Sequence, residues 1–134
     1  MNVVLDTNVL ISGVFFGGPP GQVLQAWRDE NIQLVASPEI LREYAEVLGR
    51  LGMRYPSVET TNITELIASH CRVVESPPLS APISADPDDD KFIACALASG
   101  TAIIISGDAH LLNVQGVADL EITKPADFIA NHLL

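Results

Sequence analysis

The sequence has few cysteines and no long hydrophobic run. Its 134 residues include only 2 cysteines, with no C-x-x-C spacing, so neither a disulfide framework nor a cysteine-based zinc site is expected. No apolar stretch approaches the roughly 20 residues that cross a bilayer. The first residues also lack the basic region and apolar core of a signal peptide. We therefore expect a cytoplasmic protein in which Cys71 and Cys95 are buried free thiols.

The sequence is also short of basic residues, which limits what the protein can bind by charge. Only 7 lysines and arginines stand against 17 aspartates and glutamates, and the formal net charge is −10. A protein that holds nucleic acid by charge alone normally carries a basic surface, so the composition counts against that class. It suits a protein that gathers carboxylates around cations, or one that pairs with a basic partner.

What is present is the composition of a single globular domain. Hydrophobic residues make up 48% of the chain and charged residues 18%, and a chain of 134 residues can bury a core without disulfides. No repeat or composition shift divides the chain, so we predict one domain over residues 1–134. Short apolar runs such as residues 3–5 and 103–105 alternate with helical periodicity, which predicts an α/β fold around a parallel sheet.

Local signals predict where several helices begin and end. Ser37 is a capping residue followed by a proline and a glutamate, which is typical of a helix start. Asp86 before Pro87 forms a second start, and it leads into an apolar helix that Gly100 ends. The remaining predictions are a loop over residues 17–21, a helix over 22–29 and a strand over 71–75.

Acidic residues follow two of the predicted strands. Asp6 comes directly after residues 3–5, and Asp108 comes shortly after residues 103–105. The carboxyl ends of parallel strands meet at one edge of a sheet, which is where ligands bind in such folds. Two acids far apart in the sequence are therefore expected on the same edge.

Glu43 and Asp90 lie on or at the start of helices that such a sheet would carry nearby. Clustered carboxylates repel one another unless protons or cations intervene. We therefore predict an all-oxygen site for Mg²⁺ or Mn²⁺, which could activate water for phosphodiester hydrolysis. Its candidate metal ligands and catalytic residues are Asp6 and Asp108, one of the helix glutamates Glu39, Glu43 and Glu46, and at least one acid of residues 86–90.

Each of these acids also has a purely structural interpretation. Asp6 and Asp108 could cap the helices that follow them, and Glu43 could be solvated on a polar helix face. The acids of residues 86–90 could serve the dipole of their helix. Asn8 and Ser106 are auxiliary candidates, since each could orient a carboxylate or merely satisfy the backbone. No role is assigned to the histidines, which are His70, His110 and His132.

Taken together, these motifs resemble the PIN-domain family, in particular the ribonuclease toxins of toxin–antitoxin modules. Residues 4–10 are similar to its first motif, an apolar strand followed by D-T-N. Residues 37–43 resemble the second motif, and residues 90–96 resemble the third, D-x-x-I-A-x-A. Residues 106–112 resemble the fourth motif, and residues 122–128 the last strand and helix. The resemblance spans nearly the whole chain.

The resemblance implies a three-layer α/β/α fold with a central twisted parallel sheet of four or five strands. It implies an endoribonuclease that cleaves RNA with Mg²⁺ or Mn²⁺, forms a homodimer and is neutralised by a cognate antitoxin protein. The resemblance makes Asp6, Glu43, Asp90 and Asp108 the metal ligands and catalytic residues. Its second motif singles out Glu43 and its third Asp90, with Asp88 and Asp89 as auxiliaries. RNA would be held by the metals and a few basic residues, for which Arg42 and Lys91 are candidates.

Two other functions stay open at this point. A receiver-like signalling domain also has an early acid, a doubly wound sheet and a late Lys-Pro pair, here Lys124 and Pro125. It needs a phosphoacceptor aspartate after its third strand, where this chain has residues 75–77, Glu-Ser-Pro. The other alternative is a PIN-like protein kept for binding, with slow catalysis, which would suit the acidic composition.

Overall fold

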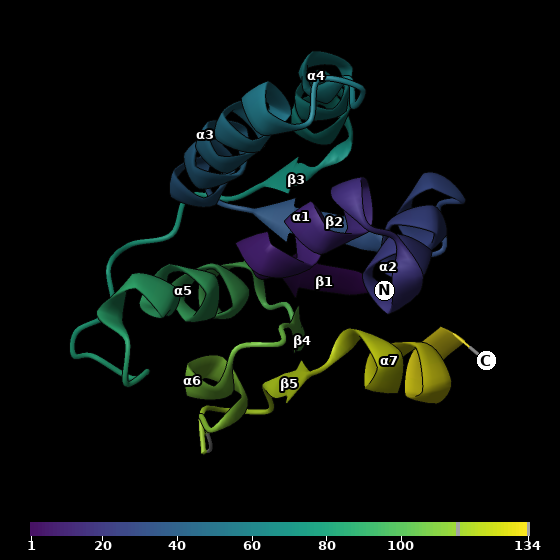
Figure 1. Ribbon diagram of the computed structural model, residues 1–134. Coiled ribbons are helices and arrows are strands. Elements are labelled where there is room, and N and C mark those ends of the chain that lie inside the picture. The colour runs from purple at the N-terminus through teal and green to yellow at the C-terminus, as the bar shows by residue number, and fades with distance from the viewer. Residues whose placement is uncertain (115, 134) are drawn as a thin grey trace.

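A five-stranded parallel sheet forms the centre of the protein, with helices on both of its faces (Figure 1). The structure is a computed structural model that describes residues 1–114 and 116–133. It confirms the predicted three-layer α/β/α architecture. The strands are β1 (Asn2–Leu5), β2 (Gln33–Ala36), β3 (Arg72–Val73), β4 (Ile103–Ile105) and β5 (Glu121–Thr123), and their order in the sheet is β3-β2-β1-β4-β5.

This strand order is not that of a receiver domain. In a receiver-like sheet the first strand lies between the second and the third. Here β1 lies between β2 and β4, and each of its pairings is parallel. The receiver-like alternative is therefore wrong. The central place of β1 also means that its carboxyl end adjoins the ends of two other strands.

The helices begin close to the positions that local signals predict. The Ser37 hydroxyl accepts a hydrogen bond from the N–H of Ile40 at 3.2 Å, and Gly100 ends its helix with a left-handed φ of 69°. The helices are α1 (Thr7–Phe15), α2 (Gly18–Arg28), α3 (Pro38–Arg54), α4 (Thr60–His70), α5 (Asp90–Ser99), α6 (Ala109–Leu112) and α7 (Pro125–Phe128). A 3₁₀ turn, η1 (Pro87–Asp89), precedes α5, and a π-type turn, η2 (Ile129–Leu133), follows α7.

Two local predictions are wrong in their bounds. The predicted loop over residues 17–21 is mostly the first turn of α2, because a proline in a first helical turn needs no N–H partner. The predicted strand over residues 71–75 pairs only at Arg72–Val73, since β3 is an edge strand. Both thiols are free as predicted, but Cys71 is only half-buried.

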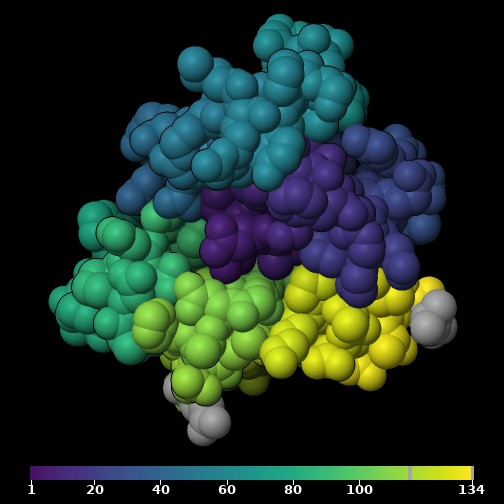
Figure 2. All heavy atoms as spheres, viewed as in Figure 1, coloured from purple at the N-terminus to yellow at the C-terminus, as the bar shows by residue number. Residues whose placement is uncertain are grey.

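The core holds the site-bearing strands in fixed register. The side chains of β4 and of residues 3–5 in β1 are buried, and α5 packs on β1, β2 and β4. Figure 2 shows the N-terminal segment surrounded on one face by segments from the middle and the end of the chain. Among the described residues, no helix is both long and apolar enough to cross a membrane.

Candidate metal centre

Asp6 and Ser106 meet because of the register between β1 and β4. Leu5 pairs with Ile105, so the residues that follow them, Asp6 and Ser106, lie beside each other. The N–H of Asp6 still donates to the carbonyl of Ile105 at 3.0 Å. Ser106 is fully buried, donates its hydroxyl hydrogen to Asp6 Oδ2 at 2.7 Å, and accepts from the N–H of Asp108 at 2.9 Å. One serine therefore ties both strand-end aspartates together.

Glu43 reaches the same edge of the sheet from α3. The Thr7 hydroxyl donates to Glu43 Oε2, and the Lys91 ammonium lies 2.9 Å from Glu43 Oε1. The next residue, Tyr44, is buried and donates its hydroxyl hydrogen to the carbonyl of Leu5. Tyr44 therefore fixes α3 over the end of β1, which places Glu43 beside the first turn of α1.

Asp89 is the acid of the 86–90 run that faces Asp6 and Asp108. Its side chain is only 8% exposed, and its Oδ2 atom is buried without a hydrogen-bond partner among the described residues. Burial, followed by the charges of Asp108, Asp6 and Asp86, raises the pKa of Asp89 to about 6. An unpartnered buried oxygen is costly, so a group that binds it would stabilise the site.

Asp90 is not among the acids that the structure brings together. Its Oδ1 accepts from the N–H of Ser84 at 2.7 Å and its Oδ2 from the N–H of Ile83 at 3.2 Å. Both oxygens thus hold the loop before η1. Asp88 is exposed and lines a hollow with Asp90 on the outer side of α5. Of the three neighbouring acids, Asp89 faces the site, although the sequence predicts Asp90 as the ligand.

The capping interpretation holds for one strand-end aspartate and fails for the other. Asp6 occupies the N-cap position of α1, but its side chain makes no capping hydrogen bond. Asp108 Oδ1 accepts from the N–H of His110 at 2.8 Å and so caps α6. Each aspartate therefore has one carboxylate oxygen engaged by the protein, Asp6 Oδ2 by Ser106 and Asp108 Oδ1 by the N–H of His110.

The remaining predicted residues lie at the margin. Asn8 is exposed and lines a pocket of about 570 Å³ together with Asp108 and Lys124. Arg42 is exposed and lines a hollow between α3 and α4, so it stays a predicted RNA contact. Lys91 lies inside the site, with a side chain only 11% exposed.

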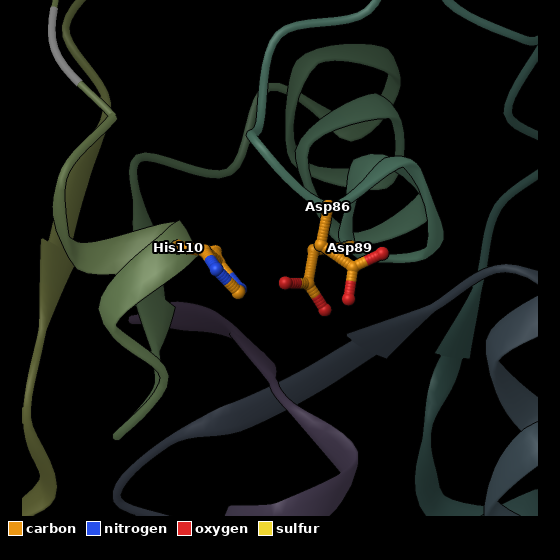
Figure 3. A group of neighbouring side chains, drawn as sticks. All are labelled: Asp86, Asp89 and His110. Carbon is orange, nitrogen blue, oxygen red and sulfur yellow. The ribbon is translucent and has the colours of Figure 1, made fainter.

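Sequence reasoning gave no role to His110 and considered Thr7 beside Asn8 without preferring it, and the structure places both here. Thr7 holds Glu43 in the way that was predicted for Asn8. His110 points from α6 toward Asp86 and Asp89 (Figure 3), and one ligand atom of each residue lies within 4.8 Å of the other two. The signal for His110 was its place two residues after Asp108, which is weak because any helix start can carry a histidine.

Four residues form what we call the acid cluster: Asp6, Glu43, Asp89 and Asp108. Burial raises the pKa of Asp6, and the charges of Asp108 and Glu43 raise it further. The ammonium of Lys91 offsets only part of this charge. The donor atoms are hard carboxylate oxygens, which is the set that Mg²⁺ and Mn²⁺ prefer. The chemistry of these donors suits a divalent cation, but among the described residues the group of three whose ligand atoms all lie within 4.8 Å of one another is Asp86, Asp89 and His110.

In the absence of metal, the protein is expected to gain stability as the pH falls from 7.5 to 5. The pKa of Asp89 is about 6 in the folded chain against an ordinary value of 3.8, so the folded state binds more protons between these values. Its contribution is complete below about 3.8 and is lost as the pH rises through about 6. The charged side chain costs on the order of 2 kcal/mol at neutral pH.

Asp89→Asn should therefore raise the Tm of the metal-free protein at pH 7.5 by about 5 °C and flatten the pH profile. Thermal unfolding in EDTA at a series of pH values measures both effects. The matched control is Asp88→Asn, which changes an exposed neighbour and should leave the profile as in the wild type. An unchanged profile in Asp89→Asn would contradict the assignment.

Comparison with known proteins places these residues in a family. A model described as "PIN domain" matches residues 2–110, a span that contains the whole acid cluster. The uncharacterized protein MJ1680 of Methanocaldococcus jannaschii is 36% identical over 140 aligned residues, which cover 96% of this chain and 90% of that protein. No solved structure gives a significant match.

Proposed function

The chain belongs to the PIN domain family, whose members are generally nucleases, and we propose that it is a metal-dependent endoribonuclease. Its metal would be held by the acid cluster of Asp6, Glu43, Asp89 and Asp108. The proposal retains three of the four acids predicted from the sequence and places Asp89 where the motif suggested Asp90. The target bonds are the phosphodiesters of RNA.

The observation that carries this proposal is the buried, unpartnered Oδ2 of Asp89 beside two further carboxylates. A purely structural acid would normally have its hydrogen-bonding capacity filled. Three negative groups in one partly buried place are unfavourable without a counter-charge. A bound divalent cation would give Asp89 Oδ2 a partner and would supply the counter-charge. The phosphates of RNA carry oxygens that such an ion can bind.

The residues around the acid cluster have distinct parts in this mechanism. Asp6, Glu43, Asp89 and Asp108 would hold a divalent cation, which would supply activation of water and stabilisation of the leaving oxygen of the phosphodiester. Ser106 engages Asp6 Oδ2 and so fixes the direction of Asp6 Oδ1, while Thr7 does the same for Glu43. The ammonium of Lys91 lies beside Glu43, where it can bind a phosphate oxygen of the substrate.

Hydrogen-bond donors around the carboxylates matter because they fix each oxygen before substrate arrives. Outer partners of metal ligands typically contribute 10-fold to 100-fold to affinity or activity. Ser106 contacts both Asp6 and Asp108, so it positions two of the four proposed ligands from one buried atom. It is a positioning residue in this proposal, since its hydroxyl is already used by the protein.

The finer parts of the proposal rest on the resemblance of the motifs to ribonuclease toxins. They are the choice of RNA over DNA, either Mg²⁺ or Mn²⁺ as the working ion, a homodimer, a cognate antitoxin protein as partner and a cytoplasmic location. A neighbouring reading frame that encodes a short protein with a DNA-binding motif would support the toxin role. The net charge of −10 suits pairing with a basic segment of such a partner.

The protein is expected to cleave a fluorescent single-stranded RNA with Mg²⁺ or Mn²⁺ and to leave it intact in excess EDTA. Adding back an excess of the metal should restore cleavage, because the acid cluster would refill. Denaturing gels over a time course measure the fragments, and a DNA strand of the same sequence tests the choice of RNA.

RNA fragments that form equally fast in EDTA would contradict the metal-dependent mechanism. Metal-dependent binding of RNA without any cleavage would support instead the alternative of a PIN-like binding protein. The control for a contaminating nuclease is a preparation of Glu43→Gln, which should lose cleavage under the same purification.

A further inference from the structure

A second group of possible ligands lies on the outer side of the acid cluster. Asp86 and Asp89 come from the two ends of η1, and His110 comes from the first turn of α6 (Figure 3). Their ligand atoms all lie within 4.8 Å of one another. The three residues belong to segments that are separate in the sequence and meet only through the packing of α5 and α6 against the sheet.

The free oxygen of Asp89 is an independent sign that this place takes a ligand. The side chain is 92% buried, as its exposed fraction of 8% shows, and its Oδ2 has no partner among the described residues. Asp86 uses Oδ1 to accept from the N–H of Asp88 at 3.0 Å, which leaves its second oxygen available. Each aspartate can thus give one oxygen without losing a contact that the structure shows.

His110 changes the chemistry of the site because it adds a nitrogen donor. Its ring is exposed, and Nδ1 lies 3.4 Å from Asp108 Oδ1, so three carboxylates surround the imidazole. Imidazole nitrogen is a good ligand for first-row transition metals, whereas Mg²⁺ favours oxygen. A mixed set of two oxygens and one nitrogen therefore discriminates between these ions.

We propose that Asp86, Asp89 and His110 form a second divalent-metal site that prefers Mn²⁺ and other transition-metal ions to Mg²⁺. It shares Asp89 with the acid cluster. Three protein ligands leave coordination positions open for water or a phosphate oxygen. This site goes beyond the proposed cleavage reaction, because two of its three ligands, Asp86 and His110, lie outside the acid cluster and it would bind metal without any RNA present.

The test is pulsed electron paramagnetic resonance of Mn²⁺ added to the metal-free full-length protein. Coordination by imidazole gives a ¹⁴N modulation, which is expected in the wild type and lost in His110→Asn. The matched control is His70→Asn, which removes an exposed histidine on α4 and should keep the signal. Oxygen-only coordination in the wild type would overturn the proposal.

Affinity gives a second readout that does not depend on cleavage. In His110→Asn the Kd for Mn²⁺ should rise at least about 10-fold, as measured by titrating the signal of the free ion. The Kd for Mg²⁺, measured by competition with Mn²⁺, should change less than about 2-fold. Asp86→Asn should also weaken Mn²⁺, and the fold should survive because asparagine caps a helix as well as aspartate. Equal effects on both ions would overturn the preference.

These outcomes are separate from the fate of the proposed nuclease. Glu43→Gln changes only the acid cluster, so it should abolish RNA cleavage and keep the ¹⁴N modulation. A protein that shows the modulation but cleaves no RNA would retain this metal site and lose the nuclease. A protein that cleaves RNA but shows oxygen-only Mn²⁺ coordination would retain the nuclease and lose this metal site.

Discussion

Asp89→Asn is expected to lower the rate of metal-dependent RNA cleavage at least about 1,000-fold, while Asp90→Asn keeps it within about 10-fold. Asp89 gives the proposed metal a buried oxygen that has no other partner among the described residues. Losing transition-state stabilisation of about 4 kcal/mol corresponds to three factors of ten in rate. Single-turnover cleavage at a saturating concentration of Mn²⁺ measures this chemical step.

Asp90→Asn is the matched control because the two residues are adjacent and the change is the same. Asparagine keeps one acceptor oxygen for the amides of Ile83 and Ser84, so the cost should be about 1 kcal/mol of stability. Thermal unfolding separates that cost from a loss of activity. If Asp89→Asn keeps full activity and Asp90→Asn loses it, the assignment of Asp89 as a metal ligand is contradicted. Asp90, which the motif suggests, would then be the ligand.

Asp6→Asn is expected to abolish both cleavage and the stabilisation of the fold by Mg²⁺. At a free metal concentration about 100 times its Kd, a ligand that binds only the native state contributes about 2.7 kcal/mol. The asparagine oxygen can still accept from Ser106, so the folded state should persist without the metal. The Tm of wild type and variant, each with Mg²⁺ and with EDTA, gives the four values that are needed.

The control is Asp119→Asn, which removes an exposed acid just before the amino end of β5, at the edge of the parallel sheet opposite the acid cluster. It should keep both cleavage and the metal-induced rise in Tm. An Asp6→Asn protein that is stabilised by Mg²⁺ as strongly as the wild type would contradict the metal site. Loss of cleavage with unchanged metal binding would instead assign Asp6 a role in the reaction other than holding the ion.

Much of the fold could be predicted because its signals are local. Ser37, Asp86 and Gly100 marked helix ends, and the structure confirms the capping hydrogen bonds or the backbone conformation of each. The buried strands β1 and β4 were predicted because continuous apolar runs suit a sheet that is covered on both faces. The start of α2 was missed because a Gly-Pro segment has the same composition in a loop and in a first helical turn.

The candidate site could be predicted only in outline. The place of Asp6 and Asp108 follows from topology, since carboxyl ends of parallel strands share an edge. Nothing local shows that Ser106 would contact both, because that depends on the pairing of Leu5 with Ile105. Glu43 could not be separated from its acidic neighbours by periodicity, and its contacts with Thr7 and Lys91 join three elements.

The order of strands and helices and the presence of acids at one sheet edge were determined by the sequence itself, because each follows from local residue patterns. Only the tertiary structure decided which acid of the 86–90 run faces that edge. Asp89 ends the 3₁₀ turn η1 and Asp90 begins α5, so the direction of each side chain depends on the rotation of α5 and of the turn that leads into it. That rotation is set by burying residues 92–96 against three strands, and a helix that is apolar on nearly every side does not encode it locally.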